Sequence, residues 1–390
     1  MMIKLLTVIG ARPQIIKAAA LSRAIRNSFS DRLQEIILHT GQHYDRNMSQ
    51  VFFDELEIPH PDFNLNVGSG AHGQQTALMI KGIEEHICKV KPQFIILYGD
   101  TNSTLAGAVA ASKAGVDVVH IEAGLRSFNK RMPEEVNRIV CDHVSTLLFT
   151  PTIAGYQNLL REGFSDNNSQ PFNIDNPGLF HCGDIMYDNS LYFTTLAEKK
   201  SDILKKHNLQ PQEFVLVTIH RDLNTDNPIR LTAIFETLNK LAYSYKIDFI
   251  LPLHPRTAKM INELLAKELI AQITKNRYIK IIQPVSFLEM IMLEKAARMI
   301  ITDSGGVQKE AYFFKKPSII LRPETEWIEI VENKVGILAN ADPEKIENAF
   351  LNFMKSGNLD FPPLFGDGKA AEFICNLLIE TYQFKIKSNS

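Results

Sequence analysis

Acidic residues follow two predicted apolar strands and open a predicted helix. Asp100 and Glu122 each come directly after an apolar run, and Glu134 and Glu135 fall in a first helical turn. Structural explanations exist, because Asp100 could cap the following helix and a carboxylate in a first turn complements the helix dipole. Glu122, however, lies where a buried strand reaches the edge of a sheet, a costly position for an unused charge. Asp100, Glu122 and one of the adjacent pair Glu134 and Glu135 are therefore candidates for acid–base chemistry with separated pKa values.

Two basic residues, Arg12 and Lys17, follow the first predicted strand. Pro13 suits the first position of a helix, so both cations would lie near a helix N-terminus. Helix N-termini bind anions, and this pair therefore indicates a phosphate site. The alternative is that both residues are ordinary solvated surface cations.

The second half of the chain carries a similar set of polar residues after its predicted strands. His220 and Arg221 follow one strand directly, and His254 follows another. Ser304-Gly305-Gly306 forms a strand–turn–helix pattern in which glycines would let backbone amides approach a diphosphate closely. Glu310 falls within the helix that follows and could reach a ribose.

Several classes of cofactor are disfavoured. No predicted strand is followed by GxGxxG, so a tightly bound nicotinamide is not expected. The 11 histidines show no metal-binding spacing, and we predict neither a catalytic metal nor any other cofactor.

The bulk properties indicate a soluble cytoplasmic enzyme. A formal net charge of -2 gives no global field that would attract nucleic acid or anionic lipid. The 4 cysteines lack CxxC spacing, which fits a reducing compartment. The apolar N-terminus is short and reads as a strand, not a signal peptide, and no apolar run approaches the length of a membrane span.

Short β-branched runs alternate with helical patterns, which predicts two α/β domains with parallel sheets. We expect an N-terminal domain over residues 1–175, a nucleotide-binding domain over 176–365, and a final segment over 366–390. The predicted strands cover 3–9, 35–39, 94–98, 116–121 and 147–150 in the first domain, and 214–219, 249–253, 279–282, 299–302 and 318–321 in the second.

The junctions after these strands, taken together, resemble one family, the non-hydrolysing UDP-N-acetylglucosamine 2-epimerases. The matching motifs, in chain order, are Gly10-Ala11-Arg12-Pro13 with Lys17, Gly41-Gln42-His43, Gly99-Asp100-Thr101, His120-Ile121-Glu122-Ala123-Gly124-Leu125-Arg126, Pro133-Glu134-Glu135-Val136-Asn137-Arg138, His220-Arg221, His254-Pro255, Asp303-Ser304-Gly305-Gly306 and Gly366-Asp367-Gly368. The resemblance implies the GT-B fold, with two Rossmann-like domains, a cleft between them and a C-terminal helix that crosses back to the first domain. It also implies a homodimer that acts on a UDP-sugar.

The resemblance further implies roles for individual residues. Catalysis would fall to Asp100, Glu122, Glu134 and His220. UDP binding would fall to Arg12, Lys17, His254, Ser304, Gly305, Gly306 and Glu310. The sugar would be contacted by Gln14, Arg131, Arg138 and Arg221.

The chemistry of the family reaction fits the absence of a dinucleotide loop. The hydrogen on C2 of an N-acetylhexosamine is not acidic, so inversion needs either transient oxidation or prior loss of the anomeric leaving group. In the second route UDP departs from C1, a 2-acetamidoglucal forms, and UDP adds back after protonation of the other face. This route requires a diphosphate site and two acid–base groups.

Departures from the usual family pattern concern the substrate. Gln14, Arg131-Met132 and Glu326-Trp327 are similar to the branch that epimerises UDP-2,3-diacetamido-2,3-dideoxy-glucuronate. Arg131 could pair with a C6 carboxylate in such a sugar. The alternatives are a hydrolysing epimerase, a GT-B glycosyltransferase, or an inactive nucleotide-sugar sensor, because fold alone does not fix function.

Overall fold

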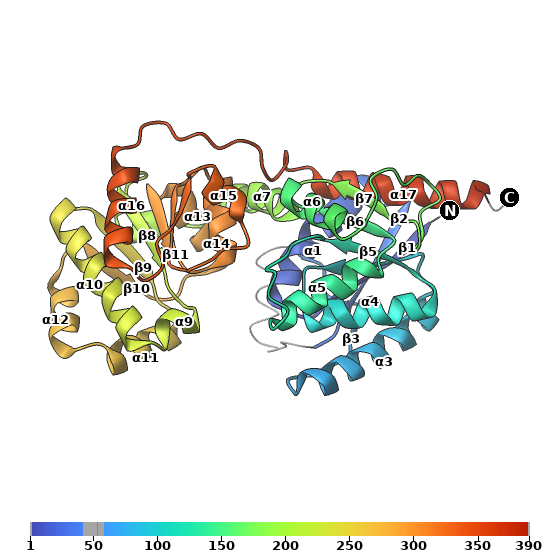
Figure 1. Ribbon diagram of the computed structural model, residues 1–390, viewed down its shortest axis with the longest axis horizontal. Helices are drawn as coiled ribbons and strands as arrows, with labels where there is room; N and C mark the ends of the chain where they lie inside the picture. The colour runs from blue at the N-terminus through green and yellow to red at the C-terminus, as the bar shows by residue number, and fades with distance from the viewer. Residues whose placement is uncertain (1, 42–52, 54–57, 389–390) are drawn as a thin grey trace. The chain divides into compact units, whose positions relative to one another are not determined.

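The computed structural model describes residues 2–41, 53 and 58–388, which form two compact units (Figure 1). The first unit contains Met1–Leu191 and Pro363–Ser390, and the second contains Tyr192–Pro362. Within the described residues no helix is both long and apolar enough to cross a membrane.

The first unit is built on a parallel sheet with the order β3-β2-β1-β4-β5-β6-β7. Because the order reverses between β1 and β4, the loops after these strands flank the switch point where α/β sheets bind ligands. Two of its inner strands, β4 and β6, are buried along their whole length, as expected when both faces are covered. The strands are β1 (Ile3–Ile9), β2 (Leu33–His39), β3 (Phe63–Asn64), β4 (Phe94–Tyr98), β5 (Asp117–Ile121), β6 (Leu147–Thr150) and β7 (Gly178–His181).

The helices of the first unit connect these strands. Their bounds are α1 (Arg12–Ala24) with a π-helical extension (Ile25–Phe29), α3 (His72–Val90), α4 (Asn102–Ala114), α5 (Pro133–His143), α6 (Ile153–Arg161), the first part of α7 (Ile185–Lys200) and α17 (Ala370–Ser388). The start of α4 is fixed by Thr101, whose side chain accepts hydrogen bonds from the backbone N–H groups of Ser103 and Thr104. Thr101 is therefore the N-cap, and Asp100 is not needed for that structural role.

The second unit repeats the doubly wound pattern, with the sheet order β10-β9-β8-β11-β12-β13 and a switch point between β8 and β11. Its strands are β8 (Phe214–Thr218), β9 (Asp248–Pro252), β10 (Ile279–Ile282), β11 (Met299–Thr302), β12 (Ser318–Ile320) and β13 (Gly336–Leu338). Its helices are α8 (Ile203–Lys206), α9 (Asp222–Thr225), α10 (Pro228–Tyr245), α11 (Pro255–Leu264), α12 (Lys267–Lys275), α13 (Phe287–Ala296), α14 (Gly305–Phe313), α15 (Ile328–Glu332) and α16 (Pro343–Lys355).

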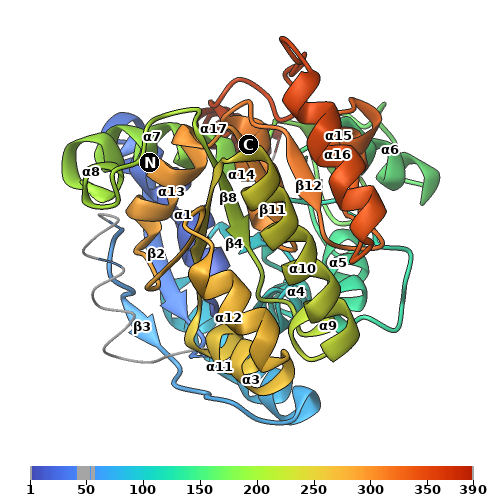
Figure 2. The same cartoon turned by 90° about the vertical axis from the view of Figure 1, so that its left-hand side faces the viewer.

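Two apolar layers sandwich the second sheet. One contains residues of α10 and α16, such as Phe235 and Phe350, and the other contains residues of α13 and α14, such as Leu293 and Ala311. Figure 2 shows α13 to the left of β8 and β11, and α16 to their right. The predicted α/β class with two Rossmann-like domains is confirmed for each unit.

The unit boundaries differ from the expected positions at residues 175 and 365. The first unit continues through β7, because this strand pairs in parallel with β6. After the second unit the chain returns to the first, where Asp188 accepts hydrogen bonds from the backbone N–H groups of Ala370 and Ala371 at 3.2 and 2.8 Å. Asp188 thereby caps α17 from within α7, and burial raises the pKa of this carboxyl to about 6.

Candidate active site

Glu122 directly follows β5, and its backbone is in the left-handed region, with φ at 75°. This conformation is uncommon for a residue with a side chain and stores strain that the surrounding structure must hold in place. Here the N–H groups of Glu122 and Ala123 both donate to the carbonyl of Phe149, at 3.1 and 3.0 Å. The Glu122 side chain is only 8% exposed. The strained turn thus fixes a buried carboxylate at the carboxyl edge of the sheet.

Glu122 forms an ion pair with Lys17 of α1. The pair lies against Gly99, where a Cβ would come 3.0 Å from Lys17 Nζ and 3.2 Å from Glu122 Oε2. Gly99 also has a φ of 59°, so a side chain at this position would be both strained and crowded. The sequence-based reading placed Lys17 on a diphosphate; in this structure its partner is the candidate catalytic carboxylate.

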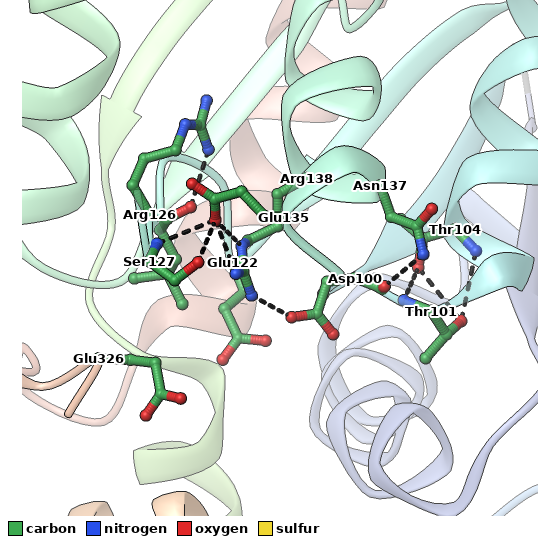
Figure 3. A network of polar contacts seen from close by, with 12 residues as sticks. Asp100, Thr101, Thr104, Glu122, Arg126, Ser127, Glu135, Asn137, Arg138 and Glu326 are labelled. Carbon is green, nitrogen blue, oxygen red and sulfur yellow. Dashed lines mark hydrogen bonds and ion pairs between the residues drawn. The ribbon is translucent and has the colours of Figure 1, made fainter. Parts of the chain in front are cut away.

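Asp100 follows β4 and forms an ion pair with Arg138 of α5, as Figure 3 shows. Its backbone carbonyl accepts a hydrogen bond of 2.8 Å from the side-chain amide of Asn137. Burial raises the pKa of Asp100 against the opposing charges of Lys17 and Arg138, and Glu122 and Glu134 raise it further. The raised pKa of Asp100 lies closer to neutral pH, and general acid–base catalysis is most effective when the pKa is near the working pH.

Arg138 is buried, and it also binds Glu135, with its Nη2 2.8 Å from Glu135 Oε2. It was expected to contact the sugar, but its guanidinium is committed to Asp100 and Glu135. These ion pairs hold Asp100 beside α5, and the sugar contact of Arg138 stays a prediction.

Glu135, for which the sequence offered the helix dipole as a sufficient structural explanation, is the centre of a hydrogen-bond network (Figure 3). It is 1% exposed and accepts hydrogen bonds from the backbone N–H groups of Ser127 and Phe128, both at 2.9 Å, and from Ser127 Oγ at 3.0 Å. Burial opposes its charge, but the hydrogen bonds from Ser127 and Arg138 lower its pKa. Glu135 therefore ties the loop before α5 to Arg138, and that interpretation from the sequence was too limited.

We expect Glu135→Gln to lower both stability and kcat. The amide would lose the charge that pairs with Arg138, and a hydrogen bond to a charged group contributes about 1.5–3 kcal/mol. Urea unfolding and steady-state kinetics measure the two effects. Glu85→Gln on the exposed surface of α3 is the matched control. A Glu135→Gln protein as stable and active as the control would contradict this positioning role.

Glu134 and Arg131 are both exposed, Glu134 in the first turn of α5 and Arg131 in the preceding loop. Glu134 lies close enough to Asp100 for its charge to raise the pKa of Asp100. Arg12 is the exposed first residue of α1. These three side chains thus lie on the surface of the first unit.

Gln14 does not have the expected freedom to contact a sugar, because it is 1% exposed and its amide is fully hydrogen-bonded within the protein. Its Oε1 accepts from the N–H groups of Gly10 and Ala11 at 2.9 and 3.3 Å. Its Nε2 donates to the Tyr98 carbonyl and to Thr104 Oγ1, both at 3.0 Å. Four partners exhaust the capacity of an amide side chain. Gln14 instead joins the loop after β1 to the loop after β4.

His120, a fully buried residue of β5, supports the loop after β4. Its Nε2 lies 2.8 Å from the Gly99 carbonyl and its Nδ1 lies 2.6 Å from Asp142 Oδ1. Burial opposes a charge here, but Cys141 and Asp142 raise the pKa of His120 well above its ordinary value. An imidazolium has a donor for each of these acceptors. Asp142 also pairs with Arg126 at 2.7 Å. His120 and Arg126 are the first and last residues of the matching motif around Glu122, and the sequence alone indicated no role for either.

In the second unit Asp303 organises the loop that carries His220 and Arg221. Asp303 is fully buried at the end of β11 and accepts hydrogen bonds from the backbone N–H groups of both residues, at 3.1 Å from each. Asn224 donates a third at 3.0 Å. Burial lowers the pKa of His220, and the charges of Arg221 and His254 lower it further against the opposing effect of Asp303. His220 is thus held about half exposed and with its neutral form favoured.

The Ser304-Gly305-Gly306 turn starts α14, and Ser304 is its N-cap, accepting from the N–H of Val307. Neither glycine has a positive φ, and a Cβ on Gly306 would meet only Ser304 Oγ, at 3.8 Å. Backbone geometry and packing among the described residues therefore do not require glycine here. Open space beside exposed amides is what a closely approaching diphosphate needs.

Trp327 holds this turn from one side. Its indole Nε1 donates to the Gly305 carbonyl at 3.0 Å, and Lys309 lies 4.3 Å from the ring centroid. Arg322 and Glu326 form a bidentate pair nearby, with both contacts at 2.9 Å. Trp327 was noted in the sequence as a departure from the family pattern, and its contact with the turn could not be read there.

The remaining predicted residues of the second unit lie on two helices. His254 is the exposed N-cap of α11, where its Nδ1 accepts from the N–H of Arg256 at 3.4 Å. Glu310 is half-buried in α14, beyond the Ser304 turn. Gln42 and His43 of the second family motif lie outside the described residues.

These features define a class. Two Rossmann-like units, strand-end carboxylates in one and a serine–glycine turn in the other describe a GT-B-like enzyme. The chain belongs to the UDP-N-acetylglucosamine 2-epimerase family, whose model matches residues 26–379, and the members of this family are isomerases.

Individual relatives cover nearly the whole chain. It is 46% identical to a UDP-N-acetylglucosamine 2-epimerase homolog of Methanococcus maripaludis, over 96% of this chain and 99% of that protein. It is 44% identical, over the same shares, to the UDP-2,3-diacetamido-2,3-dideoxy-D-glucuronate 2-epimerase of Pseudomonas aeruginosa. The structure of the Methanocaldococcus jannaschii UDP-GlcNAc 2-epimerase in complex with UDP-GlcNAc and UDP matches with a TM-score of 0.81 and 41% identity, over 97% of this chain and 100% of that chain.

Proposed function

We propose that this protein inverts C2 of a UDP-N-acetylhexosamine by eliminating UDP and adding it back. The observation that carries the proposal is the pair of carboxylates at adjacent strand ends, half-buried Asp100 and buried Glu122, each held by a cation. Such an arrangement provides acid–base groups in distinct electrostatic environments, which inversion through proton exchange requires.

The reaction balances without an external oxidant. A base removes the C2 proton, the C1–O bond breaks, and its electron pair leaves with UDP while a C1=C2 double bond forms. An acid then delivers a proton to the opposite face of C2, and the UDP oxygen attacks C1. We assign these proton transfers to members of the trio Asp100, Glu122 and Glu134.

The other predicted residues would hold the nucleotide. In the first unit Arg12 and Lys17 would supply positive charge to a phosphate, and in the second unit the Ser304-Gly305-Gly306 turn would supply backbone donors. His220 would act beside the diphosphate, and Glu310 would accept hydrogen bonds from ribose hydroxyls. His254 would contact the nucleotide, and Arg221 the sugar.

The sugar carries an acetamido group at C2 in both candidate substrates, UDP-N-acetylglucosamine and its 2,3-diacetamido-2,3-dideoxy-glucuronate analogue. The exposed guanidinium of Arg131 suits the C6 carboxylate of the second. We further propose that the enzyme acts as a cytoplasmic homodimer that supplies bacterial surface polysaccharide synthesis.

Incubation with each UDP-sugar in deuterated water, followed by NMR at C2, tests the proposal. Deuterium at C2 of both epimers is the expected result. Free reducing sugar would instead indicate a hydrolase, and UDP release that depends on an acceptor would indicate a glycosyltransferase. Preference for the uronate that is lost in Arg131→Gln would assign the C6 contact.

We expect UDP to bind without a divalent metal and to change the fluorescence of Trp327. This is the one tryptophan of the chain, and its indole N–H bonds to the turn proposed to hold the diphosphate. A titration with UDP in EDTA should give the same fluorescence change and the same Kd as a titration with Mg²⁺. The variant Trp327→Phe should lose the signal while calorimetry still detects UDP. A signal that disappears with EDTA would contradict binding by protein groups alone.

A further inference from the structure

Glu294 is a carboxylic acid inside the second unit that the proposed chemistry does not use. It lies on α13 with 0% exposure, beside the apolar layer that contains Leu293, Ala297 and Ala311. Among the described residues, no N–H or O–H group donates to either of its carboxyl oxygens. An ionised carboxylate in such surroundings would carry a large desolvation cost with nothing to offset it.

Another carboxyl, that of Glu310, lies on the adjoining helix α14, close enough to Glu294 for the two groups to interact. Two carboxylates cannot hydrogen-bond to each other unless one of them carries a proton. Burial raises the pKa of Glu294 well above its ordinary value, and the charge of Glu310 and the hydrogen bond to it raise this pKa further. Glu294 is fully buried whereas Glu310 is half-buried, so the proton belongs mainly on Glu294.

We propose that Glu294 is a protonated positioning residue, which donates a hydrogen bond to Glu310 and so holds that carboxylate ionised and oriented toward the ribose of UDP. The inference rests on the proposed nucleotide role of Glu310. The inference adds Glu294 as a second carboxyl behind Glu310, and the proton of Glu294 forms the hydrogen bond between them. Free rotation of Glu310 would otherwise cost entropy on each binding event, and the bond to Glu294 removes part of that cost in advance.

Two substitutions separate the hydrogen bond from the packing. Glu294→Gln keeps the shape and supplies an N–H donor, so UDP affinity should remain close to that of the unmodified protein. Glu294→Leu removes the donor, and UDP affinity should fall roughly tenfold, as expected for a lost hydrogen bond to a charged group. The same titrations with 2′,3′-dideoxy-UDP should show no difference among the three proteins, because that ligand has no ribose hydroxyl for Glu310 to accept. Calorimetry provides the Kd values.

An infrared difference spectrum tests the proton without any nucleotide. At neutral pH the spectrum of the unmodified protein should contain a protonated-carboxyl band that Glu294→Gln lacks. Absence of that band would overturn the proposal, as would a Glu294→Gln protein that binds UDP as weakly as Glu294→Leu. Equal weakening for UDP and 2′,3′-dideoxy-UDP would also overturn it, because it would show a packing effect. If the unmodified protein binds both ligands equally well, the ribose role of Glu310 is wrong, and the infrared band still decides whether Glu294 carries the proton.

Discussion

We expect kcat to fall by roughly 10²- to 10⁴-fold in at least two of the variants Asp100→Asn, Glu122→Gln and Glu134→Gln, the range that general acid–base catalysis contributes. Each substitution keeps the shape of the side chain and removes its proton transfer. Asp100 and Glu122 are buried or half-buried and ion-paired, whereas Glu134 is exposed. The two paired residues should therefore show the larger losses. Epimerisation rates and C2 deuterium exchange measure the effect.

The ion pair between Lys17 and Glu122 gives this experiment a second readout. In Glu122→Gln the ammonium loses its anionic partner and remains available to a diphosphate. UDP should therefore bind Glu122→Gln at least as tightly as it binds the unmodified enzyme, although turnover is lost. Glu85→Gln, on an exposed helix surface, should behave as the unmodified enzyme. Near-normal C2 exchange in all three variants would refute the mechanism.

The largest loss of stability is expected for Asp142→Ala. Asp142 is fully buried and pairs with His120 at 2.6 Å and with Arg126 at 2.7 Å. Its removal leaves two buried cations without this partner, and breaking a buried ion pair in this way costs about 3–5 kcal/mol. Urea unfolding measures the difference. Asp31→Ala, at an exposed position, is the control. A cost of less than about 1 kcal/mol would contradict the network's role.

The ion pair between Asp142 and His120 should make the stability that Asp142 contributes depend on pH. The pKa of His120 is raised, so its stabilisation is complete below the unfolded value near 6.5 and is lost as pH rises through the folded pKa. Burial opposes the charge of Asp142, but His120 and Arg126 lower its pKa, so its stabilisation is lost as pH falls through that lowered value. The difference in the free energy of unfolding between the unmodified protein and Asp142→Ala should therefore be largest from about pH 4 to 6.5. A difference that grows above pH 8 would contradict the assignment.

The strand-end carboxylates could be predicted because their positions depend on local pattern. An apolar run that ends in Asp100 or Glu122 predicts both the strand and the sheet edge at which the residue lies. The two-domain α/β class followed in the same way from alternating strand and helix signals. The boundary expected at residue 175 differs from the structure because the polar stretch before β7 resembles a linker although β7 still pairs with β6.

The supporting residues could not be predicted because their partners are distant in sequence. Gln14 bonds to the carbonyl of Tyr98, 84 residues away, and nothing in the loop after β1 encodes that contact. Glu135 and Glu134 are adjacent and chemically identical in the sequence. Only the fold shows that Glu135 faces inward to Ser127 while Glu134 faces solvent. Sequence patterns thus located the strand-end residues, and tertiary hydrogen bonding decided which neighbours hold them.

The capping of α17 by Asp188 has a consequence for how the chain folds as it is synthesised. The second unit, Tyr192–Pro362, is one continuous stretch, whereas the first unit needs residues from both ends of the chain. On the ribosome, where domains fold as units while synthesis proceeds, the second unit can complete its sheet as soon as it has emerged. The N-terminal half must wait for Ala370 and Ala371 before Asp188 finds its partners. The part of the protein made first is therefore the part that is finished last.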